Sequence, residues 1–209
     1  MIELEKSPGR WTITLNRPHK ANALSLGMLE TLNTMVADAA KTADLKALVF
    51  TGAGNRVFSA GADLTQAGAG VDITTNPVWE DLSGRIAALD CLTIAALNGT
   101  LAGGAFGMAL ACDLRLAVPS AKFFYPVLKN GFLPQPSDVK RMIDLIGPAR
   151  TKLILLAGQK LTADQALDFG LIDVIAPDNK ITSTLNDLIA DAAGAAPAVL
   201  SAIKRSCTI

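Results

Sequence analysis

Hydrophobic positions along the chain follow strand and helix periods in alternation. The run Trp11–Leu15 alternates apolar and polar side chains, as a half-buried strand does, and Leu45–Phe50 is an apolar run typical of a buried strand. Between them, apolar residues from Met28 to Val36 recur at helical spacing after Ser25, a residue type that caps helices. Strands alternating with helices predict an α/β fold with crossover connections.

The same alternation continues to about residue 118, and from Ser137 onward the chain is mostly helical. Strands are expected at Thr93–Leu97 and Leu114–Val118 with a helix at Gly103–Ala111 between them, and Val57–Leu64 is expected as a turn entering a short helix. Further helices are expected over 138–146, 148–156, 162–169 and 182–193. We divide the chain into a core, 1–195, and a short C-terminal helical tail, 196–209.

One apolar stretch is long enough to be compared with a membrane span. Ile94–Cys112 carries no charge over nineteen residues. Its glycines and Asn98 break it into a strand, a turn and a helix, so we expect buried core and no membrane partner.

Composition and charge exclude several classes of protein. Half of the 209 residues are apolar and 18% are charged, which excludes a disordered chain. Nineteen basic residues balance nineteen acidic ones without a basic stripe, so no nucleic-acid partner is expected. The three scattered cysteines have no metal-ligand spacing and no secretory signal is evident, which indicates no metal site and a cytoplasmic location.

Two segments place small residues where a strand gives way to a helix: Phe58–Leu64 and Asn98–Gly104. The first N–H groups of a helix have no partner within it, and small residues let a ligand approach the backbone. Two such N–H groups aimed at one oxygen form an oxyanion hole, which stabilises enolates and tetrahedral intermediates. From the spacing alone, two tight and well-packed strand–helix turns are the favoured explanation of the segments.

Several motifs occur together and in a fixed order. They are Thr14–Pro18, Asn22–Ser25, Phe58–Leu64, Ile94–Gly99 followed by Gly103 and Gly104, Ala111–Asp113, Gly147–Arg150, Leu155–Gly158 and Ala166–Gly170. Over residues 11–205 this set resembles the crotonase (enoyl-CoA hydratase/isomerase) superfamily.

The resemblance implies a crotonase-like spiral of repeated ββα units with helical C-terminal elaborations, and homotrimers or dimers of trimers. It implies an acyl-CoA substrate of the kind used in fatty acid metabolism, with coenzyme A as part of the substrate and no separate cofactor. The backbone N–H groups of Ala62 and Gly104 correspond to the family's oxyanion hole. The positions implied to bind the CoA thioester are Lys20, Ala21, Ala23, Ala60, Gly61, Asp63, Leu64, Gly103, Phe106, Gly107, Pro126 and Val127.

This sequence departs from the family pattern at the two catalytic glutamates. One glutamate normally lies three residues after the second oxyanion glycine, where this chain has Gly107, and the other follows a proline, where it has Val127. Hydration of an enoyl thioester needs a general base and a general acid, and neither residue can move a proton. We therefore expect a lyase or isomerase activity, decarboxylation or isomerisation, in preference to efficient hydration. Relatives also continue for several helical turns beyond the position of Ile209, so the helical C-terminal region is expected to be shortened.

Tyr125 and Asp138 flank the altered site and are the candidates for a proton-transfer or orienting role. A core-edge tyrosine and a helix-capping aspartate remain the alternative interpretation of the two residues. For the whole protein, the alternative is a non-catalytic acyl-CoA-binding protein or regulatory subunit.

Overall fold

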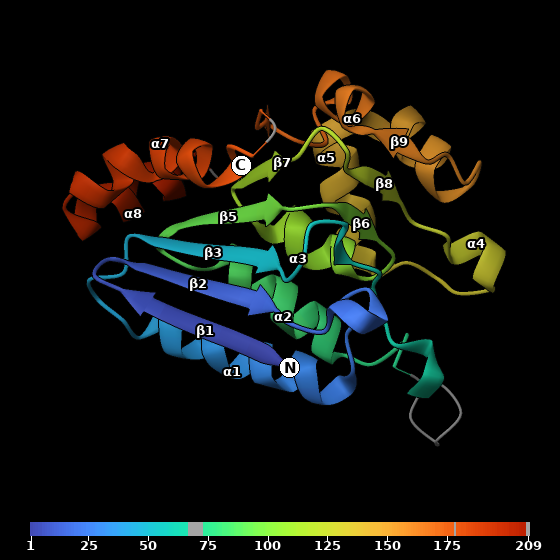
Figure 1. Cartoon of the computed structure of the whole chain (residues 1–209), viewed down its shortest axis with the longest axis horizontal. Helices are drawn as coiled ribbons and strands as arrows, with labels where there is room; N and C mark the ends of the chain where they lie inside the picture. Colours follow the sequence, from blue (N-terminus) through green and yellow to red (C-terminus); the bar gives the residue numbers. More distant parts are fainter. Residues whose placement is uncertain (67–72, 178, 208–209) are drawn as a thin grey trace.

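The computed structural model describes residues 1–66, 73–177 and 179–207 and contains two β-sheets surrounded by helices (Figure 1). The strands are β1 (Ile2–Ser7), β2 (Arg10–Leu15), β3 (Ala47–Gly52), β4 (Val57–Ser59), β5 (Leu92–Leu97), β6 (Thr100–Ala102), β7 (Leu114–Ala117), β8 (Lys122–Phe124), β9 (Leu161–Thr162) and β10 (Val174–Ile175). The helices are α1 (Leu26–Ala40), α2 (Val78–Ala87), α3 (Ala105–Ala111), α4 (Val127–Asn130), α5 (Pro136–Leu155), α6 (Ala163–Phe169), α7 (Ile181–Gly194) and α8 (Pro197–Ser206), with short 3-10 turns η1 (Pro18–Lys20) and η2 (Leu64–Gln66).

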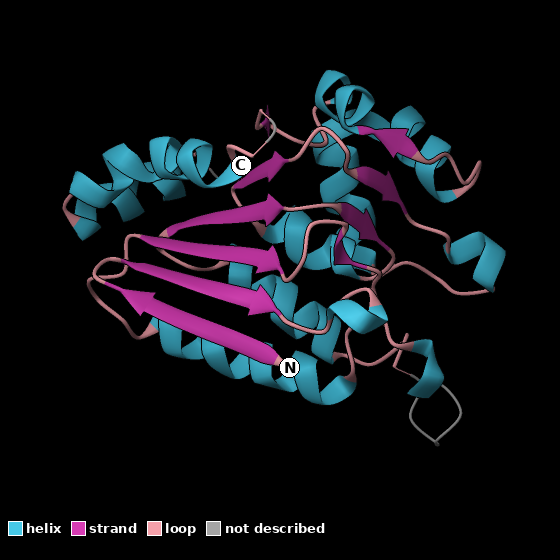
Figure 2. Ribbon diagram, in the orientation of Figure 1, coloured by secondary structure: helices cyan, strands magenta, loops and turns pink. Residues whose placement is uncertain are grey.

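In three successive pairs of strands, the first strand lies in one sheet and the second strand lies in the other. The larger sheet has the order β1-β2-β3-β5-β7-β10 and the smaller has the order β4-β6-β8-β9. Thus β3, β5 and β7 lie in one sheet while the strands that follow them, β4, β6 and β8, lie in the other, and a helix follows each pair. Figure 2 shows these strands crossing the molecule side by side. The structure therefore has the spiral of repeated ββα units that was expected.

Helices cover both faces of the central strands of the larger sheet, which are apolar on both faces. On β3, Leu48 and Phe50 belong to the core formed with α1, α2 and α3. The intervening residues Ala47 and Val49 belong to a second, smaller core that also contains Leu185 of α7. The continuous apolar run of this strand follows from burial on both sides.

The boundaries of the longer elements agree with the sequence pattern, and the apolar stretch Ile94–Cys112 is divided among β5, β6 and α3. In the part of the chain that the structure describes, no helix is both long and apolar enough to cross a membrane. The predicted helices 138–146 and 148–156 correspond to the two halves of α5, which meet at Gly147 with the non-helical angles φ 77° and ψ 165°.

The expectation for Val57–Leu64 is wrong in its first half, where Val57–Ser59 forms strand β4 parallel to β6. A strand of three residues is too short to show a period of two, which explains why the pattern did not reveal it.

Candidate active site

A pocket opens where the turn after β4, the start of α3 and the segment after β8 meet. Its empty space is about 510 Å³, a value that includes open solvent at its mouth. The residues that line it are Ala60, Ala62, Leu64, Thr74, Trp79, Gly103, Gly104, Tyr125, Pro126, Val127, Asn130, Phe132, Leu133 and Gln135.

Close backbone packing brings the two small-residue segments together. An ideal Cβ atom on Gly61 would lie 2.8 Å from the backbone nitrogen of Gly104 and 2.9 Å from the carbonyl oxygen of Ala102. Gly61 also has a φ of +88°, a conformation that glycine adopts without strain. Only glycine at this position allows the turn after β4 to lie directly against the start of α3.

The two backbone N–H groups that matter most belong to Ala62 and Gly104. Both residues line the pocket, and neither N–H donates to any acceptor among the described residues. Buried or partly buried N–H groups are nearly always hydrogen-bonded, so a pair without protein acceptors beside a pocket can donate to a ligand oxygen. The arrangement fits the stabilisation of negative charge that develops on that oxygen.

The loop after β2 runs along the turn that carries Ala62 and fixes it. The N–H of Leu24 donates to the carbonyl of Gly61 at 2.8 Å, and the N–H of Asp63 donates to the carbonyl of Leu24 at 2.8 Å. A further bond joins the N–H of Ala60 to the carbonyl of Ala21 at 3.0 Å. The loop after β2, where CoA-binding positions are predicted, and the turn that carries Ala62 therefore form one hydrogen-bonded unit.

Asp63 holds this unit together through its side chain. Its carboxylate accepts hydrogen bonds from the side chain and backbone of Thr65 and forms an ion pair with Arg17. The hydrogen bond from Thr65, then that from Arg17, lowers the pKa of Asp63 to about 2. Asp63 is therefore ionised near neutral pH and turned away from the pocket lining, which indicates a structural role.

The opposite wall carries Tyr125, whose ring stacks on Phe106 with centroids 5.3 Å apart. Its hydroxyl donates to Oδ2 of Asp138 at 2.9 Å. Burial, followed by the nearby Asp138, raises the pKa of Tyr125 above its ordinary value, and burial raises the pKa of Asp138 to about 7. Tyr125 and Asp138, the two candidates from the sequence, are therefore hydrogen-bonded to each other, and Tyr125 is the one that lines the pocket.

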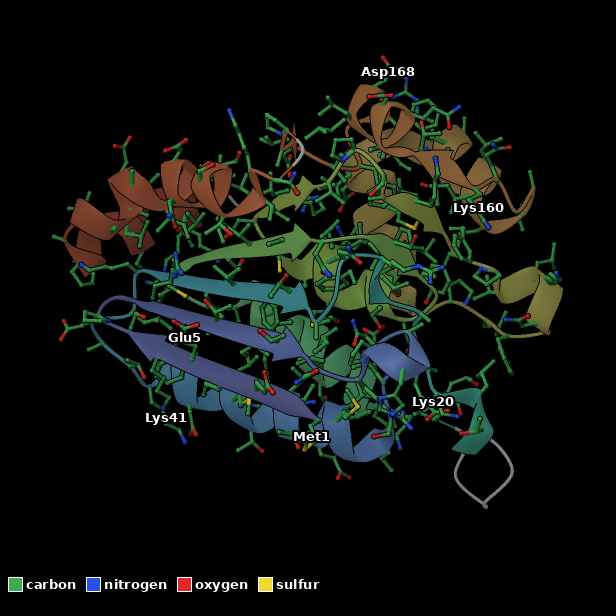
Figure 3. The ribbon with its side chains drawn as sticks, in the orientation of Figure 1. Met1, Glu5, Lys20, Lys41, Lys160 and Asp168 are labelled. Carbon is green, nitrogen blue, oxygen red and sulfur yellow. The ribbon has the colours of Figure 1, made fainter. Side chains whose placement is uncertain are left out.

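The structure brings part of the predicted set to the pocket. Eight predicted residues line it: Ala60, Ala62, Leu64, Gly103, Gly104, Tyr125, Pro126 and Val127. Phe106, Gly107 and Asp138 are buried behind this lining, and Gly61 and Asp63 support it. Lys20 is exposed on η1, after β2, where Figure 3 labels it, and Ala21 and Ala23 lie on the same loop outside the lining.

The sequence did not point to Trp79 as a pocket residue. Its indole N–H donates to the carbonyl of Ile73 at 2.7 Å, and an ideal Cβ on Gly104 would lie 3.3 Å from its ring. Trp79 lies on the buried face of α2, so its helical spacing carries no sign of a pocket. Gln135, which flanks the altered site in the sequence, also lines the pocket and donates to the carbonyl of Thr74 at 2.8 Å.

No cluster of three or more metal-ligating side chains occurs among residues 1–66, 73–177 and 179–207. Among the described residues that line the pocket, those with polar side chains are Thr74, Tyr125, Asn130 and Gln135, and none of the four is charged at neutral pH.

Comparison with known proteins relates the chain to one family. The family model described as enoyl-CoA hydratase/isomerase matches residues 5–208. YngF of Bacillus subtilis is 37% identical over 172 residues, which are 79% of this chain and 65% of that protein, so the chain spans just under two thirds of its length. The carnitinyl-CoA dehydratase of Salmonella agona is 30% identical over 194 residues, covering 92% of this chain and 74% of that protein. A crystal structure of enoyl-CoA hydratase from Bacillus anthracis superposes with a TM-score of 0.92 at 27% identity, covering 99% of this chain and 82% of that one.

Proposed function

Because the chain belongs to the enoyl-CoA hydratase/isomerase family, we propose that it binds an acyl-CoA thioester in this pocket and stabilises the enolate of that thioester. The thioester oxygen lies between the N–H groups of Ala62 and Gly104. Coenzyme A enters as part of the substrate, and no separate cofactor takes part.

One observation carries the proposal: two backbone N–H groups without protein acceptors line the same pocket, and a glycine contact holds their segments together. When a thioester becomes an enolate, its oxygen gains negative charge. Preorganised N–H donors stabilise that charge more than they stabilise the neutral ground state, and this difference accelerates the reaction. Removal of one such donor typically costs about 100-fold to 1,000-fold in kcat.

The side chains around the pocket favour decarboxylation, with double-bond isomerisation as the second reaction of this class. No carboxylate is among the described residues that line the pocket, and Val127 has only an apolar side chain to offer. Hydration needs a group that activates water, whereas the loss of CO₂ from a carboxyl group next to the thioester generates the enolate without a base. The substrate is then a thioester with a carboxylate on its α-carbon.

We propose that the nucleotide part of coenzyme A binds along the loop after β2. Lys20 is exposed on this loop, which is hydrogen-bonded to the turn that carries Ala60 and Ala62. A lysine at this position can pair with a phosphate of the nucleotide while the thioester reaches into the pocket.

The experiment is an incubation of the protein with malonyl-CoA, methylmalonyl-CoA, crotonyl-CoA and a 3-enoyl-CoA. Product mass and thioester absorbance are followed, and binding is measured by calorimetry. We expect CO₂ loss from a 2-carboxyacyl thioester. The variant Gly104→Val should reduce turnover about 100-fold or more, because its side chain projects against Trp79 beside the donor.

Gly27→Ala is the matched control. Gly27 lies on α1, and a Cβ atom there would have no heavy atom within 4 Å, so activity should be unchanged. If none of the four thioesters binds, the proposal is wrong.

A non-catalytic acyl-CoA-binding protein is the second candidate, and the absence of a carboxylate from the described pocket lining favours it. This candidate predicts binding of the thioesters with no turnover of any of them.

A further inference from the structure

The carboxyl group of Asp138 occupies the place where a side chain on residue 107 would begin. An ideal Cβ atom on Gly107 would lie 2.7 Å from Oδ1 of Asp138 and 3.4 Å from its Cγ and Oδ2 atoms. Gly107 is on α3 and Asp138 is in the first turn of α5, a helix that packs against α3. Because Gly107 on α3 has no side chain, the carboxyl group of Asp138 on α5 can occupy this space.

This carboxyl group is buried, and only one of its two oxygens has a hydrogen-bond partner among the described residues. Asp138 is 1% exposed, its Oδ2 accepts the Tyr125 hydroxyl, and its Oδ1 has no hydrogen-bond partner among the described residues. A buried carboxylate with an unpaired oxygen is costly, and the neutral acid relieves the cost. Burial accordingly raises the pKa of Asp138 to about 7.

The charged groups around Asp138 have opposite effects on its pKa. Glu80 of α2 faces it and raises the pKa of Asp138, whereas Arg141, one turn further along α5, lowers it. Helix α3 contributes no titratable side chain, since Ala105–Ala111 is entirely apolar. Tyr125 is the remaining titratable neighbour, and its hydrogen bond favours the ionised form of Asp138.

Tyr125 connects this buried acid to the pocket. When Asp138 is ionised, the phenol proton is held in the hydrogen bond to Oδ2. When Asp138 is protonated, it can donate to the phenol oxygen, and the phenol O–H is then free to point into the pocket. Burial and Asp138 raise the pKa of Tyr125, so the phenol stays protonated and acts as a donor, not as a base.

We propose that Tyr125 is the catalytic acid that protonates the α-carbon of the thioester enolate, and that Asp138 is the positioning residue that resupplies its proton. This inference rests on the proposed function and assigns to two residues the step that follows enolate formation. In a 2-carboxyacyl thioester, the bond between the α-carbon and the carboxylate breaks, CO₂ leaves, and the electron pair enters the enolate. The phenol proton forms the new C–H bond, the proton of Asp138 passes to the phenolate, and Asp138 takes one proton from solvent before the next turnover.

The alternative for the same contacts is structural: the Tyr125–Asp138 bond anchors the start of α5 and no proton moves through it. The two readings differ in their pH dependence. A proton donor fed by Asp138 works only while Asp138 is protonated, so kcat should be constant below about pH 7 and fall tenfold for each pH unit above it.

The test is the pH profile of kcat and KM for decarboxylation by the wild-type protein and three variants. Tyr125→Phe should lower kcat about 100-fold with KM changed only a few-fold, since it removes one oxygen and keeps the ring stacked on Phe106. Asp138→Asn should lower kcat about tenfold or more and remove the fall above pH 7. Asp144→Asn, an exposed aspartate on the same helix, is the control and should match the wild type.

A fourth variant keeps the test decisive if Asp138→Asn does not fold. Glu80→Gln removes the charge that raises the pKa of Asp138, so the midpoint of the kcat profile should move to lower pH. An unchanged midpoint overturns the inference.

The outcomes separate the two proposals. Turnover by the wild type with a flat pH profile, or a Tyr125→Phe variant with full kcat, overturns the role of this pair and leaves the proposed function standing. A wild-type protein that binds thioesters and converts none of them overturns both.

Discussion

At the scale of single residues, Asp138 illustrates how position determines what a carboxyl group can do. Asp63 and Asp138 are both buried, but Asp63 has Thr65 and Arg17 as partners whereas one oxygen of Asp138 has none among the described residues. The pKa of Asp63 is lowered to about 2 and that of Asp138 is raised to about 7. Hydrogen bonds to the charged form dominate in the first case and desolvation dominates in the second.

The raised pKa of Asp138 predicts a pH-dependent gain in stability for Asp138→Asn. The folded state binds the proton more tightly than the unfolded chain, so this group's contribution to stability is fully present below about pH 4 and lost as pH rises through 7. Asparagine cannot ionise, so its advantage over aspartate should grow from pH 4 to pH 8 by roughly 4 kcal/mol at most. Urea unfolding at both pH values measures this, with Asp144→Asn as the exposed control. An advantage that does not change with pH would show that Asp138 titrates normally.

At the scale of elements, the site depends on strands that are too short to be recognised in the sequence. β4, β6 and β8 have three residues each, yet they place Ala62, Gly104 and Tyr125 around one pocket. Strands β2, β3 and β5 and the longer helices could be predicted because their apolar residues repeat over several periods, whereas β1 was not expected.

The two oxyanion segments could be predicted from their small residues and their family resemblance, and Tyr125 and Asp138 from their place beside the altered motif. That Asp138 fills the space above Gly107 could not be predicted, because the two residues are 31 positions apart and meet only through the packing of α5 on α3.

The surroundings of two glycines, Gly61 in the turn that packs against α3 and Gly27 on α1, predict opposite effects of substitution by alanine. Gly61→Ala should destabilise the protein by about 1–3 kcal/mol and abolish turnover, because its Cβ would lie 2.8 Å from Gly104 N at a φ of +88°. Gly27→Ala, in the exposed first turn of α1, should stabilise the protein by about 0.5 kcal/mol. Denaturant midpoints measure both, and a neutral Gly61→Ala would show that the two segments do not touch.

At the scale of the whole molecule, exposed leucines gather beside the pocket wall. Leu128 is 63% exposed, Leu133 is 85% exposed and Leu156 is 61% exposed, and all three line an apolar depression between α4 and α5. Contiguous exposed apolar surface on a folded protein usually marks an interface. The family resemblance implies a homotrimer, and we propose that this depression lies at its subunit interface.

We therefore expect the protein to sediment as a multiple of its 21.7 kDa chain mass, with three copies as the expected state. Leu156→Glu should shift the distribution toward monomer, because it places a charge in the apolar depression. Lys140→Glu, on the exposed surface of α5, is the control for an added negative charge. A wild-type protein that is monomeric at micromolar concentration contradicts this expectation.

A crystal structure with a bound acyl-CoA would show directly whether one thioester oxygen lies between the N–H groups of Ala62 and Gly104. We expect this oxygen to lie about 2.7–3.1 Å from both backbone nitrogens, with the acyl group beside Tyr125. A thioester whose oxygen contacts neither nitrogen, or a coenzyme A bound elsewhere on the protein, would contradict it.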